Sequence, residues 1–145
     1  MNKKRLLKLA DLLEADAANK KGMKFDLGTV AEPSSGKSKT PAVDCGTTGC
    51  AMGLAAVSKV FKRAGLDYKI HQKDLEPSVP WEITLYMNGD WVGYDEAAER
   101  LFEIDSHEAN HLFNPSEYGG HIKGARGERL VARRIRTFVE NKGCI

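Results

Sequence analysis

Hydrophobic residues recur every three or four positions in several segments of the chain, which is the spacing of one buried face of an α-helix. In residues 3–17 this stripe consists of Leu6, Leu9, Leu13 and Ala17. Similar stripes predict four further helices, over residues 48–64, 95–102, 106–114 and 127–141. The pattern therefore indicates a mostly helical domain with about five helices.

Two segments carry strand patterns instead. Residues 83–87 and 91–94 are rich in β-formers and flank Asn88-Gly89-Asp90. Asn-Gly is the strongest short-range signal of a β-hairpin, because both residues tolerate positive φ. A preceding strand begins near Tyr68. We therefore expect an α+β fold with one β-hairpin or a small antiparallel sheet.

The 145 residues predict a single globular domain over 1–145, within which the Pro-, Ser- and Gly-rich residues 31–44 form a mobile loop. No apolar run reaches the length of a membrane span, and no secretory signal is recognisable at the N-terminus. Three cysteines are too few for a disulfide scaffold. We expect a soluble, cytoplasmic protein without a membrane contact.

Charge is unevenly distributed along the chain. Residues 1–24 carry +4, residues 120–145 carry +5, and the part between them carries −7. If the first and last helices pack together, both basic ends reach one side of the molecule. That side would attract anionic partners, although terminal helices commonly have solvated basic faces.

The last predicted helix adds a stripe of arginines to this charge: Arg126, Arg129, Arg133 and Arg136. Such a stripe can follow the phosphates of a nucleic acid, but it also occurs as a solvated face opposite a core. Because no helix-turn-helix signature or interleaved aromatic pattern accompanies it, we expect at most weak, electrostatic nucleic-acid binding.

Two cysteines lie in a glycine-rich segment at the start of the second predicted helix: Cys45 precedes the helix and Cys50 lies in its first turn. A thiolate at a helix N-terminus has a lowered pKa, so Cys45 is a candidate catalytic nucleophile or redox thiol. Free backbone N–H groups at this turn could instead hold a phosphate. Cys50 lies on the same hydrophobic stripe as Leu54 and Phe61, so we expect it in the core. A structural turn is the competing interpretation for the whole segment.

The residues His107-Glu108-Ala109-Asn110-His111 match H-E-x-x-H, in which two histidines on one helix face bind zinc. His107 and His111 are therefore candidate metal ligands, and Glu117 stands where a third ligand can occur. Against this, the helix is short and Glu108 already fits a capping box with Asp105. We expect no bound metal and no cofactor.

Several motifs together resemble a known set of proteins. They are the run from Phe25 to Thr29, the segment from Cys45 to Gly53, the helix segment from Ala97 to Phe102, and Leu112-Phe113-Asn114-Pro115 with Tyr118. This combination resembles a widespread family of small, uncharacterised bacterial and phage proteins with a C-G-T-x-x-C-x-x-G motif. The resemblance implies the fold organisation and a bacterial or phage origin, and it implies no activity.

These observations favour a non-enzymatic bacterial or phage accessory protein that binds a macromolecular partner. The alternative is an enzyme that uses a Cys45 thiolate or the H-E-x-x-H histidines.

Overall fold

The computed structural model describes residues 1–19, 24–27, 31–32, 48–72, 81–120 and 122–143. Its α-helices are α1 (Lys3–Ala18), α2 (Ala51–Val57), α3 (Tyr94–Phe102), α4 (Ser106–Phe113) and α5 (Gly124–Glu140). Its strands are β1 (Lys24–Phe25), β2 (Ala31–Glu32), β3 (Thr48–Gly49), β4 (Leu66–Gln72), β5 (Trp81–Met87) and β6 (Asp90–Val92). Two short 3-10 helices are η1 (Lys62–Ala64) and η2 (Pro115–Tyr118). The predicted class, mostly helical α+β with five helices and a small antiparallel sheet, is confirmed.

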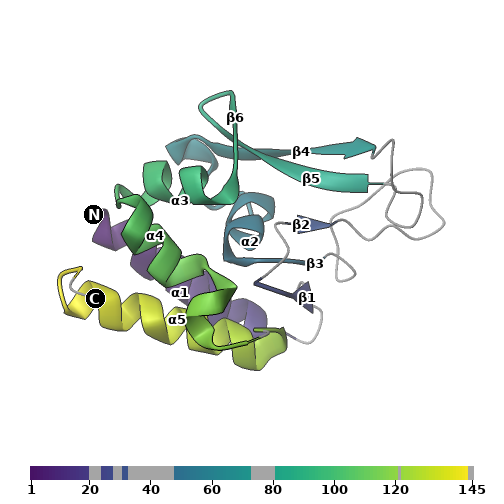
Figure 1. The fold of residues 1–145 in the computed structure, drawn as a ribbon. Coiled ribbons are helices and arrows are strands. Elements are labelled where there is room, and N and C mark those ends of the chain that lie inside the picture. Colours follow the sequence, from purple (N-terminus) through teal and green to yellow (C-terminus); the bar gives the residue numbers. More distant parts are fainter. Residues whose placement is uncertain (20–23, 28–30, 33–47, 73–80, 121, 144–145) are drawn as a thin grey trace.

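The elements lie in layers (Figure 1). The β4–β5–β6 sheet forms one side, α1 and α5 form the other, and α2 and α3 lie between them. Helix α4 packs against α3 and α5. Buried side chains from all of these elements form a single hydrophobic cluster. None of the described helices has the length and hydrophobicity that crossing a membrane requires.

The first and last helices pack against each other, as their complementary hydrophobic stripes predict. They run antiparallel and side by side (Figure 1). Leu9 and Leu13 of α1 are fully buried, as are Val131 and Ile135 of α5. Burial of such side chains stabilises a fold by about 1.5–3 kcal/mol each, so this pair of helices is a main source of stability.

The predicted hairpin is confirmed. Met87 pairs with Asp90, and the two residues between them, Asn88 and Gly89, have φ values of 52° and 85°. A turn with both central residues at positive φ matches the twist of the two strands. The turn also packs closely on Gly65, where an added Cβ would lie 2.2 Å from Asn88 Oδ1. Any other residue there would displace the Asn88 side chain and would be strained by the φ of 101° at this position.

The second helix is shorter than its hydrophobic stripe predicts. The stripe indicates a helix over 48–64, whereas α2 covers Ala51–Val57 only. It begins late because Thr48 and Gly49 form β3 and the Cys50 thiol caps the first turn. It ends early because Lys59 takes a left-handed conformation, with φ of 61°. Phe61 is still buried, so its place in the core was predicted correctly but its place in the helix was wrong.

Two other boundaries differ from the expected ones. Helix α3 is capped by Gly93, so Asp95 lies in its first turn and does not cap it. Helix α5 begins at Gly124, three residues before the predicted start. Within the predicted loop 31–44, residues 31–32 form β2, which pairs with β3; residues 33–44 lie outside the described part of the chain.

Candidate functional site

The segment that carries the two histidines begins with a complete capping box. The Asp105 side chain accepts a hydrogen bond from the backbone N–H of Glu108 at 2.8 Å, and Glu108 Oε2 accepts one from the backbone N–H of Asp105 at 2.9 Å. This reciprocal pair fixes the start of α4, as the sequence predicts. It also engages the Glu108 carboxylate, which a zinc protease of the H-E-x-x-H type would need as a base.

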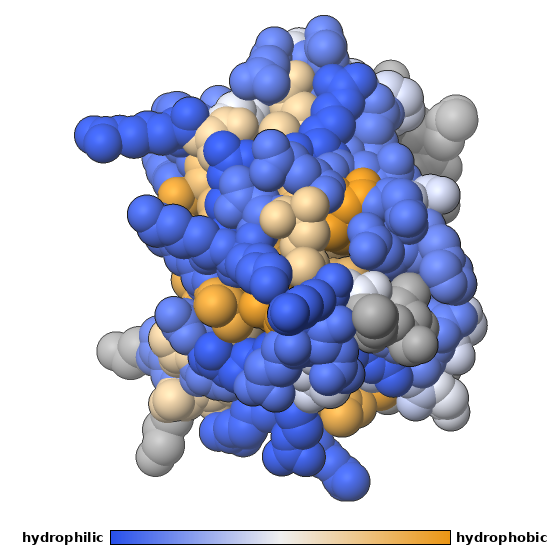
Figure 2. All heavy atoms as spheres, turned by 90° about the vertical axis from the view of Figure 1, so that its left-hand side faces the viewer, coloured by the Kyte–Doolittle hydropathy of each residue, from blue (hydrophilic) through white to orange (hydrophobic). Residues whose placement is uncertain are grey.

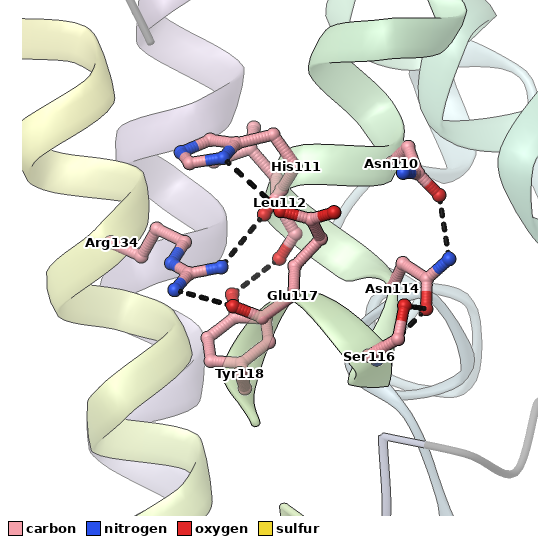
Figure 3. Close-up of polar contacts among 8 residues, drawn as sticks. All are labelled: Asn110, His111, Leu112, Asn114, Ser116, Glu117, Tyr118 and Arg134. Carbon is pink, nitrogen blue, oxygen red and sulfur yellow. Dashed lines mark hydrogen bonds and ion pairs between the residues drawn. The ribbon is translucent and has the colours of Figure 1, made fainter. Parts of the chain in front are cut away.

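A tight turn follows α4 and brings Glu117 back to His111. Asn114 caps η2 by accepting from the backbone N–H of Ser116 at 2.9 Å. The Tyr118 hydroxyl donates to the backbone carbonyl of Leu112, which fastens the turn to α4 (Figure 3). As a result, Glu117 Oε2 lies 4.0 Å from His111 Nδ1.

Arg134 of α5 holds this turn in place (Figure 3). Its guanidinium donates to the backbone carbonyls of His111 and Glu117, both at 3.0 Å, and lies 3.7 Å from the centre of the Tyr118 ring. Burial, and next the positive charge of Arg134, lower the pKa of His111 below its ordinary value of 6.5. The imidazole is therefore neutral at pH 7. Sequence reasoning missed Arg134, because its contacts are with residues 16 to 23 positions away.

A pocket of about 330 Å³ opens between α4 and α5 at His111. Its hydrophobic lining consists of Phe138 and Leu130. The centre of the Phe138 ring lies 6.4 Å from the centre of the His111 imidazole. Its rim is polar or basic, with Arg133, Arg134, Thr137 and Asn141.

A second hollow of about 310 Å³ continues along α5 and is lined by Arg126, Arg129, Leu130 and Arg133. Because the two hollows share Leu130 and Arg133, they form one continuous surface, which we call the α5 surface. The end of the molecule where α1 begins and α5 ends shows hydrophobic side chains in the gaps between hydrophilic ones (Figure 2).

The arginines of the predicted stripe have different surroundings. Arg136 donates to both carboxylate oxygens of Glu14, at 2.9 and 3.1 Å, and also pairs with Asp11. Its charge is therefore used within the fold. Among the described residues, Arg129 makes one long hydrogen bond of 3.5 Å, to the backbone carbonyl of Ala17. Within the described part of the chain, Arg126 and Arg133 make no hydrogen bond or ion pair. The stripe that faces solvent is thus Arg126, Arg129 and Arg133.

The cysteine candidates have different outcomes. Cys45 lies outside the described residues. Cys50 is buried, as predicted, and its sulfur accepts from the backbone N–H of Gly53 at 3.5 Å. Burial raises the pKa of the Cys50 thiol to about 11. The thiol is therefore protonated at neutral pH, and a protonated thiol is a poor nucleophile.

The two histidines also have different surroundings. His107 is exposed on the surface of α4, and His111 lines the pocket. Among the residues that the structure describes, no group of three or more histidine, cysteine or acidic side chains is arranged to hold a metal ion. The structure does bring His111 and Glu117 together, but without a third ligand from the described residues.

One acidic pair, the buried Glu128 and the half-buried Asp16, has no counterpart in the sequence-based expectations. Glu128 of α5 is 2% exposed and forms a hydrogen bond with Asp16 of α1. Burial, together with the charge of Asp16 and this hydrogen bond, raises the pKa of Glu128 to about 8. No local pattern identifies this pair, because only the α1–α5 packing makes the two carboxyl groups neighbours.

Comparisons of the chain with protein-family models, with curated proteins and with solved structures found no match. The resemblance to the C-G-T-x-x-C-x-x-G family therefore stays a prediction from the motifs.

Proposed function

We propose that this chain is a non-enzymatic accessory protein of a bacterium or phage, acting in the cytoplasm, that binds an acidic macromolecular partner on the α5 surface. The observation that carries the proposal is the pair of adjacent hollows along α5. It combines three solvent-facing arginines, Arg126, Arg129 and Arg133, with a hydrophobic pocket.

The electrostatic surroundings support an anionic partner. In the described residues, Arg126 and Arg133 have no acidic neighbour within ion-pairing distance, so their charges are available to a ligand. Arg134 keeps α4 fixed against α5, so the pocket exists before the partner arrives. A preformed site spends less free energy on ordering itself when it binds.

The chemistry of the pocket supports binding rather than catalysis. Nucleophilic catalysis needs an activated nucleophile within hydrogen-bond reach of a base. The His111 imidazole has the Glu117 carboxylate at 4.0 Å, and the Tyr118 hydroxyl is engaged by a backbone carbonyl. Burial also raises the pKa of Tyr118, which keeps its hydroxyl protonated.

Fluorescence anisotropy with labelled polyglutamate and labelled single-stranded RNA tests the proposal. We expect wild-type protein to bind at least one of these polyanions with a Kd of about 1–100 μM, weakening about tenfold between 50 and 200 mM salt. The double variant Arg129→Glu/Arg133→Glu should abolish binding.

Lys62→Glu/Arg63→Glu is the matched control, because it makes the same change of net charge on η1, at a distance from α5 (Figure 1). It should lower affinity no more than about threefold, as expected of screened charges at long range. Equal losses in the two double variants would show that only net charge matters. That result, or no binding of either polyanion, would overturn the proposal.

A further inference from the structure

We infer that the partner's contact segment is an acidic amphipathic segment of a protein, whose aliphatic side chain enters the pocket between Leu130 and Phe138 while its carboxylates pair with Arg126, Arg129 and Arg133. This inference rests on the proposed function and names the class of partner.

The first argument is the hydrophobic content of the α5 surface. Leu130 is 40% exposed, one of three large hydrophobic residues that are exposed in the described part of the chain. It lies between the basic hollow and the pocket and belongs to both. A surface that evolved only to attract phosphates gains nothing from this leucine, whereas a protein segment gains free energy by covering it.

The second argument is spacing. Arg126, Leu130, Arg133 and Thr137 lie at i, i+4, i+7 and i+11, which places them on one stripe of α5. At a rise of 1.5 Å per residue, the stripe is about 16 Å long, or three helical turns. An amphipathic helix bound along a groove uses anchors with the same i, i+3/i+4, i+7 spacing.

The third argument is the absence of a stacking platform. Proteins that bind single-stranded nucleic acids stack the bases on exposed aromatic rings. At the α5 surface, Phe138 is 1% exposed and Arg134 covers the Tyr118 ring. Among the Phe, Tyr and Trp residues whose side chains the structure describes, the exposed one is Trp91, at 70%, and it lies on β6 at the opposite side of the molecule (Figure 1).

Charge around the pocket fits carboxylates. The groups that face His111 are Arg133 and Arg134 from α5, Glu117 from η2 and His107 from α4. Glu117 is the one acid among them, and its carboxylate is already oriented toward the His111 ring. The local balance is therefore positive, and Arg133, which makes no hydrogen bond or ion pair within the described part of the chain, remains available to a partner's acids.

The test uses a synthetic helical peptide of about sixteen residues, with leucines at i, i+4 and i+7 and glutamates on either side of them. A scrambled peptide of the same composition, polyglutamate and single-stranded RNA are the comparison probes. Wild-type protein should bind the amphipathic peptide at least tenfold more tightly than the scrambled one. Leu130→Ser should remove this difference and leave polyglutamate binding unchanged.

Trp91→Ser is the matched control, because it removes an exposed hydrophobic side chain from another surface; it should leave all affinities unchanged. Thermal melting of each variant checks that it is folded. If RNA binds more tightly than the amphipathic peptide and Arg129→Glu/Arg133→Glu abolishes that binding, the inference is wrong and the proposed function stands. If Trp91→Ser rather than Leu130→Ser removes peptide discrimination, the inference is also wrong. If no probe responds to Arg129→Glu/Arg133→Glu, the proposed function itself fails.

Discussion

Helix α5 has two faces of opposite character within the same 17 residues. The inner face, with Val131, Ile135 and Phe138, is buried against α1 and the core. The outer face presents arginines around an exposed Leu130. The comparison shows that one amphipathic helix serves both stability and binding, and that substitutions on its two faces should affect different measurements.

The two faces also differ in the environment of their charged side chains. On the outer face, arginines keep their charges in water. On the inner face, Glu128 is 2% exposed beside Asp16, and the pKa of its carboxyl group is raised to about 8. Two adjacent carboxylates cannot both stay ionised at low cost in a buried site, so Glu128 keeps its proton at neutral pH.

The largest expected effect comes from a pair of truncations on the two faces. Ile135→Ala should lower the free energy of unfolding by about 2–5 kcal/mol, because it leaves a cavity in the core. Leu130→Ala should change it by less than about 0.5 kcal/mol, since the side chain is partly exposed. Urea denaturation measures both. Similar losses in the two variants would contradict the division of α5 into a structural and a binding face.

The second prediction concerns Glu128→Gln. The folded-state pKa of Glu128 is about 8, above the ordinary value of 4.5, so the folded state holds its proton more tightly than the unfolded state. The resulting stability is complete below pH 4.5 and is lost as pH rises to about 8. The slope approaches about 1.4 kcal/mol per pH unit for one proton.

Glutamine can donate to Asp16 without titrating. Glu128→Gln should therefore remove this slope and make the protein about 1–3 kcal/mol more stable than wild type at pH 8. Urea denaturation at pH 5, 6.5 and 8 measures the effect. Asp16→Asn should weaken the slope, because it removes the neighbouring charge. Parallel pH profiles of wild type and Glu128→Gln would show that this carboxyl group ionises normally.

A smaller effect is expected for the ion pair between Arg136 of α5 and Glu14 of α1. The hydrogen bond from Arg136, and next its charge, lower the pKa of Glu14, so this pair stabilises the fold above pH 4.5 and the contribution is lost as pH falls below that value. Both partners are partly exposed, so Arg136→Gln should cost only about 0.5–1 kcal/mol, and less at high salt. Arg133→Gln is the control and should cost nothing measurable. Thermal melting at two salt concentrations distinguishes them.

The smallest expected effect concerns His111. Its pKa lies below 6.5, so the ring gains a positive charge as pH falls through that lowered value. An acidic peptide bound in the pocket should therefore bind about two- to fivefold more tightly at a pH below that lowered value than at pH 7.5. His111→Gln should remove the difference. A pH dependence that persists in this variant would assign it to groups other than His111.

The sequence by itself determined the features that depend on neighbours within about four residues. The hydrophobic stripe of residues 3–17, the Asn88-Gly89 turn and the Asp105–Glu108 capping box all belong to this class. Their stability comes from contacts along one helix or around one turn, so the residue types at fixed spacing specify them. The burial of Cys50 was predicted for the same reason.

Only the tertiary structure decided the features that depend on residues far apart in the chain. The sequence treats Arg133 and Arg136 alike, but α1 supplies carboxylates to Arg136 and none to Arg133. From the sequence alone, Glu128 resembles an ordinary surface acid. In the folded protein, α1 places Asp16 beside it. The hydrophobic stripe also predicts that α2 continues through Lys59, whereas Lys59 takes a left-handed conformation in the structure. The burial of a side chain, the charges next to it and the residues that line a pocket depend on which elements pack together. The periodicity along one element does not show which other element it packs against.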